Sequence, residues 1–164
     1  MAKKIKPLKK LPKLGTYKGR FKVTKPEKYI GDHKDVIYRS NWEKQAFKYC
    51  EDASWIQAWG SEITVVPYIC ETDKRPHRYF VDLTIVTQKG EVILVEIKPH
   101  KQTKAPKVTR KTKYALNEVA TYIKNDSKWK AARAMCEHKN TEGGRTWRFE
   151  IWTENELRKL GLKI

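Results

Sequence analysis

The sequence predicts a single α/β domain in which helices cover a central mixed β-sheet. A length of 164 residues suits one apolar core. Hydrophobic periodicity alternates between the helical and the strand period, which gives the order helix, three strands, helical region, strand, helix. A hairpin signal, a glycine between two apolar strand-like runs, lies in the middle of this order.

The first predicted helix covers residues 40–51, where apolar side chains recur at the helical period. Ser40 and Glu43 have the spacing of a capping box, in which the glutamate carboxylate accepts a hydrogen bond from the Ser40 amide. The expected apolar stripe consists of Trp42, Ala46, Tyr49, Cys50 and Ala53.

Three predicted strands follow this helix. They cover residues 62–69, 78–86 and 91–97, which are rich in β-branched and aromatic side chains. The chain then predicts a helical region over residues 112–138 and a last strand over residues 146–152. We expect the helical region to break near residues 125–127, where Asp126 or Ser127 would cap a second helix, and a capping box at Thr153 to start a short terminal helix.

The turn between the second and third strands fixes a register. Gly90 suits the left-handed position of a three-residue turn. If Thr87 faces Glu91, counting back along both strands makes Asp82 face Glu96. Directly opposed residues have Cβ atoms about 4.5–5.5 Å apart, and like charges at that distance are destabilising. A divalent cation between the two carboxylates would remove this penalty.

The net charge points to a polyanionic partner. Lysine and arginine total 36 against 19 acidic residues, which gives a formal charge of +17. Nucleic acid is the commonest partner of such a chain, while an anionic membrane surface or a ribosome-like structural role is also compatible with charge alone. The three cysteines lack metal-site or disulfide spacing and are expected to be reduced core thiols. No segment has the length and apolar character of a membrane span, so we expect an intracellular site of action.

Two segments concentrate the positive charge. Residues 1–28 contain eleven basic residues and one acid, and their prolines favour an extended arm, which is either a solvated tail or a contact to phosphates or a partner protein. Residues 98–113 are basic, contain no acid and follow the most apolar strand. This segment is either a clamp for phosphates or an ordinary solvated loop. The candidate DNA contacts of this second segment are Lys101, Lys104, Lys107, Arg110, Lys111 and Lys113.

The charged residues at the end of the hairpin form the candidate catalytic site. Asp82 and Glu96 offer the oxygen ligands that Mg²⁺ or Mn²⁺ prefers. Lys98 lies two residues after Glu96 and therefore on the same face of the strand. Such a group would hold a metal that activates water, with the lysine stabilising charge on a phosphate. The structural alternative makes Asp82 a strand-end polar residue, and Glu96 and Lys98 an exposed ion pair.

Four motifs in the chain are informative when taken together: YIGD at 29–32, YRSNWE at 38–43, HRYFVD at 77–82 and EIKP at 96–99. Jointly they resemble the motifs of the head completion nucleases of tailed phages, a family similar to the wider PD-(D/E)XK nuclease superfamily. The resemblance runs from about residue 29 to residue 157 and includes the order of elements.

The resemblance implies a restriction-endonuclease-like core and a role for each site residue. Asp82 and Glu96 would be the metal ligands and Lys98 the catalytic lysine. Glu43 would support the metal or its water, although its capping-box position gives it a purely structural alternative. Val81 stands where the family often has proline, which puts the local backbone in question more than the ligand.

The resemblance also implies a biological setting. The domain would cover residues 29–164 and would trim packaged double-stranded DNA during head-to-tail joining. The arm, residues 1–28, would contact portal or neck proteins. The protein would act in the host cytoplasm during virion assembly, with or without retention in the virion. Two alternatives stay open: a non-catalytic DNA-binding head-closure protein, and an endonuclease of the same fold from a transposition or restriction system. The sequence also leaves open whether the enzyme attacks DNA ends or cuts within a strand, and whether it uses one metal ion or two.

Overall fold

The computed structural model describes residues 18–164, so residues 1–17 of the predicted arm lie outside the described residues. In chain order the elements are β1 (Gly19–Arg20), η1 (Pro26–Lys28), β2 (Ile37–Tyr38), α1 (Asn41–Asp52), β3 (Ile56–Ser61), β4 (Val65–Ile69), β5 (Pro76–Phe80), β6 (Leu83–Thr87), β7 (Val92–Ile97), η2 (His100–Thr103), α2 (Lys113–Thr141), β8 (Trp147–Trp152) and α3 (Glu154–Lys159).

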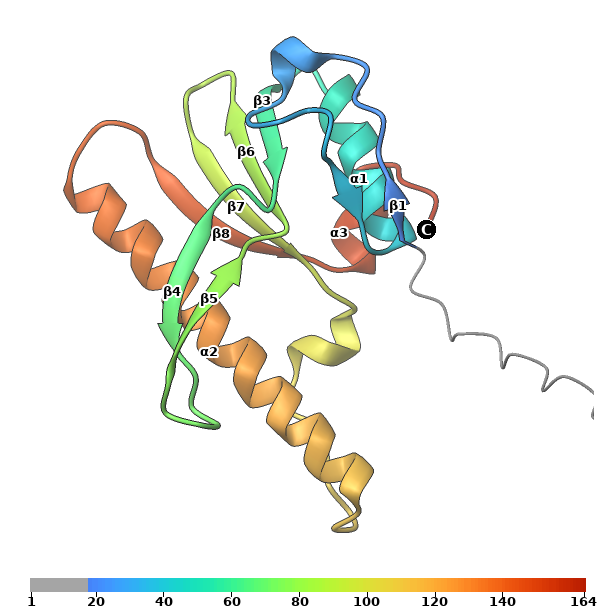
Figure 1. Cartoon of the computed structure of the whole chain (residues 1–164), viewed down its shortest axis with the longest axis vertical. Helices are drawn as coiled ribbons and strands as arrows, with labels where there is room; N and C mark the ends of the chain where they lie inside the picture. The colour runs from blue at the N-terminus through green and yellow to red at the C-terminus, as the bar shows by residue number, and fades with distance from the viewer. Residues whose placement is uncertain (1–17) are drawn as a thin grey trace, which may run out of the picture.

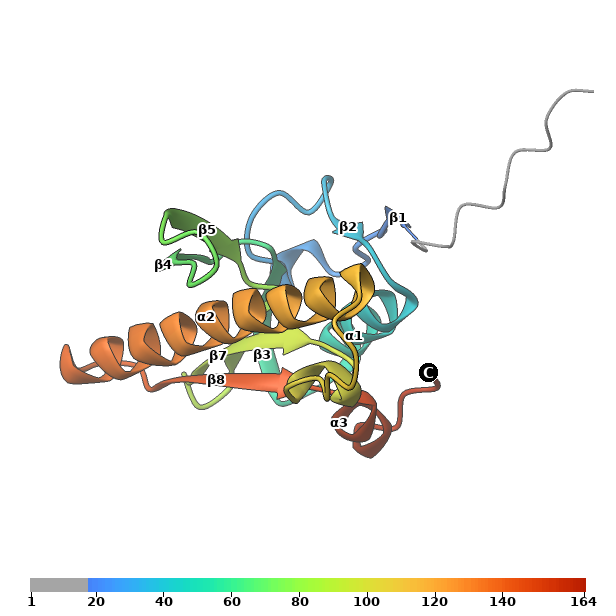
Figure 2. The ribbon, with the colours of Figure 1, turned by 90° about the horizontal axis from the view of Figure 1, so that it is seen from below.

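Helices cover both faces of a central four-stranded sheet (Figures 1 and 2). The strand order is β3-β6-β7-β8, with antiparallel pairs except between β7 and β8, which are parallel. Parallel neighbours need a long crossover, and α2 supplies most of it. One face of the sheet packs on α2, and the other packs on α1 and α3. The predicted α/β class, with a central mixed sheet flanked by helices, is confirmed.

Strand β7 is buried along its whole length because both faces of the sheet are covered. Ile93 and Val95 belong to the core cluster on the α1 side. Val92 and Leu94 belong to the cluster on the α2 side. Strand alternation therefore directs Glu96 towards the α2 side, among apolar neighbours.

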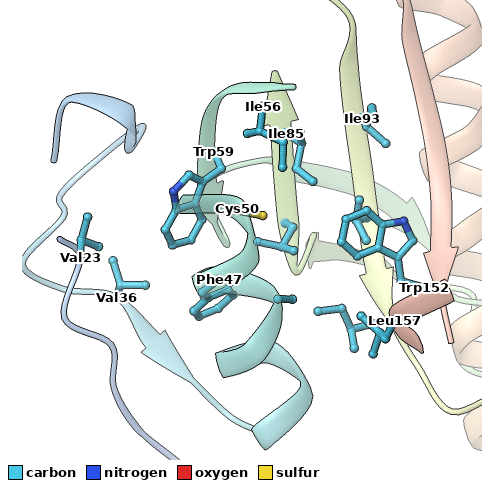
Figure 3. Close-up of a cluster of buried hydrophobic side chains, with 14 residues drawn as sticks. Val23, Val36, Phe47, Cys50, Ile56, Trp59, Ile85, Ile93, Trp152 and Leu157 are labelled. Atoms are coloured by element: carbon cyan, nitrogen blue, oxygen red, sulfur yellow. The ribbon is translucent and has the colours of Figure 1, made fainter. Parts of the chain in front are cut away.

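The core on the α1 side is built around large aromatic side chains (Figure 3). Phe47 and Trp59 are fully buried, with ring centroids 5.4 Å apart. Trp152 and Leu157 close the cluster from β8 and α3. The three cysteines are buried and free, which confirms the prediction of reduced core thiols.

The predicted hairpin register is confirmed. Gly90 has a φ of 81°, in the left-handed region, and the Thr87 amide donates to the Glu91 carbonyl at 2.9 Å. Leu83 pairs with Val95 in the ladder between β6 and β7. The residues one step beyond that last pair are Asp82 and Glu96, which are therefore adjacent at the end of the hairpin.

The predicted strand over residues 78–86 is wrong, because the chain changes partners within it. β5 pairs with β4 in a separate two-stranded hairpin, and β6 pairs with β3 and β7 in the central sheet. Val81 makes the transition, fully buried and with its amide bonded to the Thr64 carbonyl at 3.1 Å. Asp82 consequently lies at a break between two strands rather than within one.

The structure also contains an edge strand, β3, that the sequence analysis does not predict. Residues 56–61 include a glycine and a register irregularity between Ile56 and Ala58, which disrupt the alternation expected of a strand. The strand predicted over residues 62–69 accordingly shortens to β4.

The predicted break in the second helical region is wrong, because α2 is continuous. Ser127 does not cap a new helix: its hydroxyl donates to the Ile123 carbonyl at 2.8 Å and accepts from the Glu71 amide at 3.3 Å. Asp126 forms an ion pair with Lys130 at 2.8 Å on the helix surface. None of the helices in the described part of the chain is long and apolar enough to span a membrane.

The last two elements match their prediction closely. β8 ends at Trp152, and Thr153 and Glu156 form the expected capping box of α3. The amide of Lys98 donates to the Trp152 carbonyl at 3.1 Å, which extends the parallel pairing past the end of β7.

The described part of the predicted arm packs against the domain. β1 pairs with β2, and Val23 joins the core on the α1 side. Glu51, at 3% exposure, accepts hydrogen bonds from the Thr24 amide at 2.7 Å and the Lys25 amide at 3.0 Å. A buried carboxylate thus fastens the segment just after residue 18 to the end of α1.

Candidate active site

The predicted carboxylates meet at one end of the central sheet, on the face that carries α2. Asp82 directly precedes β6, and Glu96 is the fifth residue of β7. The Ile97 amide donates to Asp82 Oδ2 at 2.8 Å, which fixes the aspartate across the end of β7. The register of the hairpin and this hydrogen bond together hold the two acids side by side.

Glu96 is buried, with 4% of its surface exposed. Tyr79 donates its hydroxyl hydrogen to Glu96 Oε2 at 2.5 Å, and Lys98 Nζ lies 3.2 Å from Oε1. An exposed ion pair is therefore the wrong description of Glu96 and Lys98. A buried carboxylate needs such partners, because unpaired charge is costly away from water.

Electrostatics at this end of the sheet disfavour two ionised acids. Burial raises the pKa of Asp82 well above its usual range, and the adjacent Glu96 raises it further. Burial and then Glu96 also raise the pKa of Tyr79, so the phenol stays protonated and acts as a donor. A cation bound between Asp82 and Glu96 would offset the repulsion of their charges and stabilise the folded protein.

Glu43 lies in the first turn of α1, next to this pair. The Ser40 hydroxyl accepts from the Glu43 amide at 3.1 Å, as predicted. The Glu43 carboxylate, however, accepts from the Arg39 amide at 2.7 Å, so the predicted return to the Ser40 amide is wrong by one residue. Burial raises the pKa of Glu43, and its charge is among those that raise the pKa of Asp82.

Three further residues border the site and have no predicted role: Lys128, Arg39 and Glu62. Lys128 of α2 holds its Nζ 5.4 Å from the centre of the Tyr79 ring, and burial lowers the pKa of this lysine while Glu96 opposes the shift. Arg39 forms two 3.1 Å hydrogen bonds with Glu62. Arg39 stands inside the YRSNWE motif, whereas Lys128 carries no local signal and is brought in only by the packing of α2.

The six predicted DNA contacts are all exposed, in η2, in the loop that follows and at the first position of α2. Lys101, Lys104 and Lys107 line a cleft of about 910 Å³ together with Tyr114 and Tyr122 of α2. The other three, Arg110, Lys111 and Lys113, are not part of this lining. Along the chain this segment begins three residues after Lys98, and the carboxylates themselves are not part of the cleft lining.

Residues 53–154 match a family model described as the TnsA-like endonuclease N-terminal domain. The chain belongs to this family. The matched range of the TnsA-like domain contains Tyr79, Asp82, Glu96 and Lys98, whereas Glu43 precedes it. The chain is also 38% identical over 152 residues to a protein named head completion nuclease from Enterobacteria phage T4, covering 90% of this chain and 97% of that relative. No solved structure matches.

Both comparisons support a nuclease role for this TnsA-like domain. The side chains gathered at the end of β7 suit phosphodiester chemistry, because carboxylate oxygens can hold a divalent cation and a neighbouring ammonium can face a phosphate. Lys98, Lys128 and Arg39 add positive charge around the carboxylates.

Proposed function

We propose that the protein is a divalent-metal-dependent deoxyribonuclease that hydrolyses DNA phosphodiester bonds. The observation that carries this proposal is the buried Glu96 with the partly buried Asp82 beside it and Lys98 against it. A fold alone would not need two acids side by side in a low-dielectric environment, where their repulsion destabilises the protein. Perturbed titration in a polar cluster next to a cleft is typical of functional sites.

The residues present fit a hard divalent ion. Asp82 and Glu96 supply only oxygen atoms, as Mg²⁺ and Mn²⁺ prefer. Asp82 Oδ2 accepts the hydrogen bond of the Ile97 amide, which orients the carboxylate, and Oδ1 would be the oxygen that holds an ion. A bound divalent cation would offset the charge of both acids and supply a Lewis acid for the phosphate and its attacking water.

The protein's own side chains prepare the site for the reaction. Tyr79 and Lys98 hold the two oxygens of Glu96 in a fixed orientation. Lys98 is partly exposed, so its ammonium can also contact the phosphate and stabilise the charge that develops there. Glu43 would orient water, and Lys128 would add positive charge from the α2 side.

We propose double-stranded DNA as the substrate, bound through the exposed basic residues between η2 and the start of α2. These residues would contact backbone phosphates and give salt-sensitive, sequence-independent affinity. The name of the phage T4 relative, head completion nuclease, supports a task in head completion, in which the enzyme would trim packaged DNA. In that setting the protein acts in the host during virion assembly, and residues 1–28 contact portal or neck proteins.

A second candidate keeps the chemistry and changes the setting. The family description, TnsA-like endonuclease, favours an enzyme that cuts within DNA strands. Such an endonuclease could serve transposition or restriction and would then show preferred cleavage sites. Mapping the cut ends on a defined plasmid separates the two, because trimming of packaged DNA requires no preferred sequence.

The test is digestion of linear and circular DNA with Mg²⁺, Mn²⁺ or a chelator. We expect the wild type to cleave only with metal and Glu96→Gln to be inactive while its DNA affinity is unchanged. Glu91→Gln is the matched control, because Glu91 lies at the opposite end of β7 in an exposed pair with Arg148. Equal cleavage by the Glu96 variant and the wild type would contradict the proposal, and intact DNA in every lane would favour the non-catalytic DNA-binding alternative.

A further inference from the structure

The tip of the β4–β5 hairpin gathers three side chains with different ligand atoms. Cys70 Sγ, a carboxylate oxygen of Asp73 and a ring nitrogen of His77 all lie within 4.8 Å of one another. The three residues fall within eight positions of the chain. We propose that this cluster binds a transition-metal ion of the Zn²⁺ class, at a site separate from the carboxylates at the end of β7.

The turn itself places the three side chains together. The Cys70 amide donates to the Arg75 carbonyl at 3.0 Å, and the Lys74 amide donates to the Cys70 carbonyl at 2.8 Å. Lys74 adopts a φ of 58°, in the left-handed region that a lysine rarely occupies. Tyr68 pairs with His77 in the ladder, so alternation brings Cys70, two residues after Tyr68, to the same side as the histidine.

Each ligand atom is already oriented by a neighbour. Asp73 Oδ2 lies 2.7 Å from His77 Nε2, and Asp73 Oδ1 accepts from the Arg75 amide at 3.0 Å. The His77 ring stacks on Tyr68, with centroids 5.6 Å apart. Cys70 is 1% exposed, and its sulfur lies 3.0 Å from the Thr72 hydroxyl. Small side-chain rotations would therefore suffice to bring the three atoms around one ion.

The donor set selects the kind of ion. Thiolate and imidazole suit Zn²⁺ and related ions, whereas Mg²⁺ and Mn²⁺ prefer oxygen ligands only. Tetrahedral zinc with bonds of about 2.0–2.3 Å keeps its ligand atoms about 3.3–3.6 Å apart, which is within the 4.8 Å limit of the three atoms here and wider than the present 2.7 Å contact between Asp73 and His77. Three protein ligands leave the fourth position to water.

Binding also has a defined proton balance. The ion binds the Cys70 thiolate, so the thiol proton passes to solvent. His77 binds as the neutral ring through Nε2, with its proton on Nδ1, and its hydrogen bond to Asp73 is replaced by two bonds to the ion. No redox step or further reactant is required.

The expected effect of the ion is to fix the hairpin that reaches the candidate active site. His77 and Tyr79 are two residues apart on the same side of β5, and Tyr79 bonds Glu96. The turn also contacts α2 through the hydrogen bond from the Glu71 amide to Ser127. An ion at the tip would hold β5 in register from the end opposite to Tyr79.

The test uses Co²⁺ as the probe in place of Zn²⁺, because thiolate coordination to Co²⁺ produces a near-ultraviolet charge-transfer absorption. We expect this band in the wild-type protein and its disappearance when Zn²⁺ is added in competition. Cys70→Ser should lose the band. Cys136→Ser is the matched control, since Cys136 is buried in the same core cluster on the α2 side but lies outside the three-residue group. Its band should be unchanged.

A second variant keeps the test valid if Cys70→Ser does not fold. His77 is only partly buried, and His77→Gln removes one ligand together with the ring that stacks on Tyr68 but leaves every buried side chain in place. We expect Co²⁺ binding to weaken by about tenfold or more, the loss that perturbing a metal site typically causes. Glu96→Gln should keep full Co²⁺–thiolate absorption, which separates this site from the proposed nuclease site. Absence of the band in the folded wild type, or its persistence in folded Cys70→Ser, would overturn the proposal.

Discussion

Replacing Tyr79 with phenylalanine isolates the hydrogen bond that supports the buried Glu96. The substitution removes only the hydroxyl, which donates to Glu96 Oε2, and leaves the ring packed in the core. A hydrogen bond to a charged group contributes about 1.5–3 kcal/mol. Glu96, which loses this bond, is only 4% exposed, so water cannot easily replace the tyrosine hydroxyl. We therefore expect Tyr79→Phe to lower the free energy of unfolding by about 2 kcal/mol.

Chemical denaturation in chelator measures this loss directly, and a thermal melt should show a Tm lower by about 4–8 °C. Tyr68→Phe is the matched control, because Tyr68 is 6% exposed in the same hairpin but its hydroxyl makes no hydrogen bond to a described residue. Saturating Mg²⁺ should recover part of the loss in Tyr79→Phe, since a cation offers Glu96 another partner. If the two variants are equally stable, Glu96 does not depend on Tyr79 and the account of the site is wrong.

Three further predictions concern charge. Burial and then Glu96 raise the pKa of Asp82, so its ionisation costs stability; in chelator the wild type should lose stability as pH rises from the usual carboxyl pKa through the raised one, and thermal melts of Asp82→Asn should show neither this loss nor stabilisation by Mg²⁺. Changing Lys104 and Lys107 to glutamine should lower the slope of log affinity against log salt by about 0.9 per lost phosphate contact in DNA-binding titrations, whereas Lys89→Gln, in the exposed hairpin turn, should leave it unchanged. Glu51→Ala should cost about 3 kcal/mol because it removes two hydrogen bonds to a buried carboxylate, and limited proteolysis should then cut within residues 18–28; resistance equal to that of the wild type would contradict the fastening role of this carboxylate.

Local sequence signals were sufficient for the part of the site that lies on the β6–β7 hairpin. Gly90 determines the turn, the turn determines the register, and the register brings Asp82 next to Glu96. Alternation along β7 then places Lys98 on the same side as Glu96, as the 3.2 Å contact between them confirms. Each of these steps depends on neighbours in the chain.

The features that sequence reasoning missed depend on distant contacts. The continuity of α2 through Ser127 relies on a hydroxyl that binds a carbonyl one turn back and the amide of Glu71 in another hairpin. The strand change at Val81 follows from β5 pairing with β4 rather than with the central sheet. Lys128 approaches Tyr79 only because α2 crosses that face. Tertiary packing overrides local propensity in all three cases.

The parallel pairing of β7 with β8 has a consequence for the order of events during synthesis. Glu96 pairs in register with Ile151, and the Lys98 amide bonds the carbonyl of Trp152. A chain emerging from the ribosome presents β7 more than fifty residues before its partner β8. One edge of β7 therefore stays unpaired until β8 has been synthesised. The backbone hydrogen bonds that orient Glu96 and Lys98 are complete only when Trp152 has been added to the chain. Translation itself delays assembly of the site until almost all of the domain is available to fold around it.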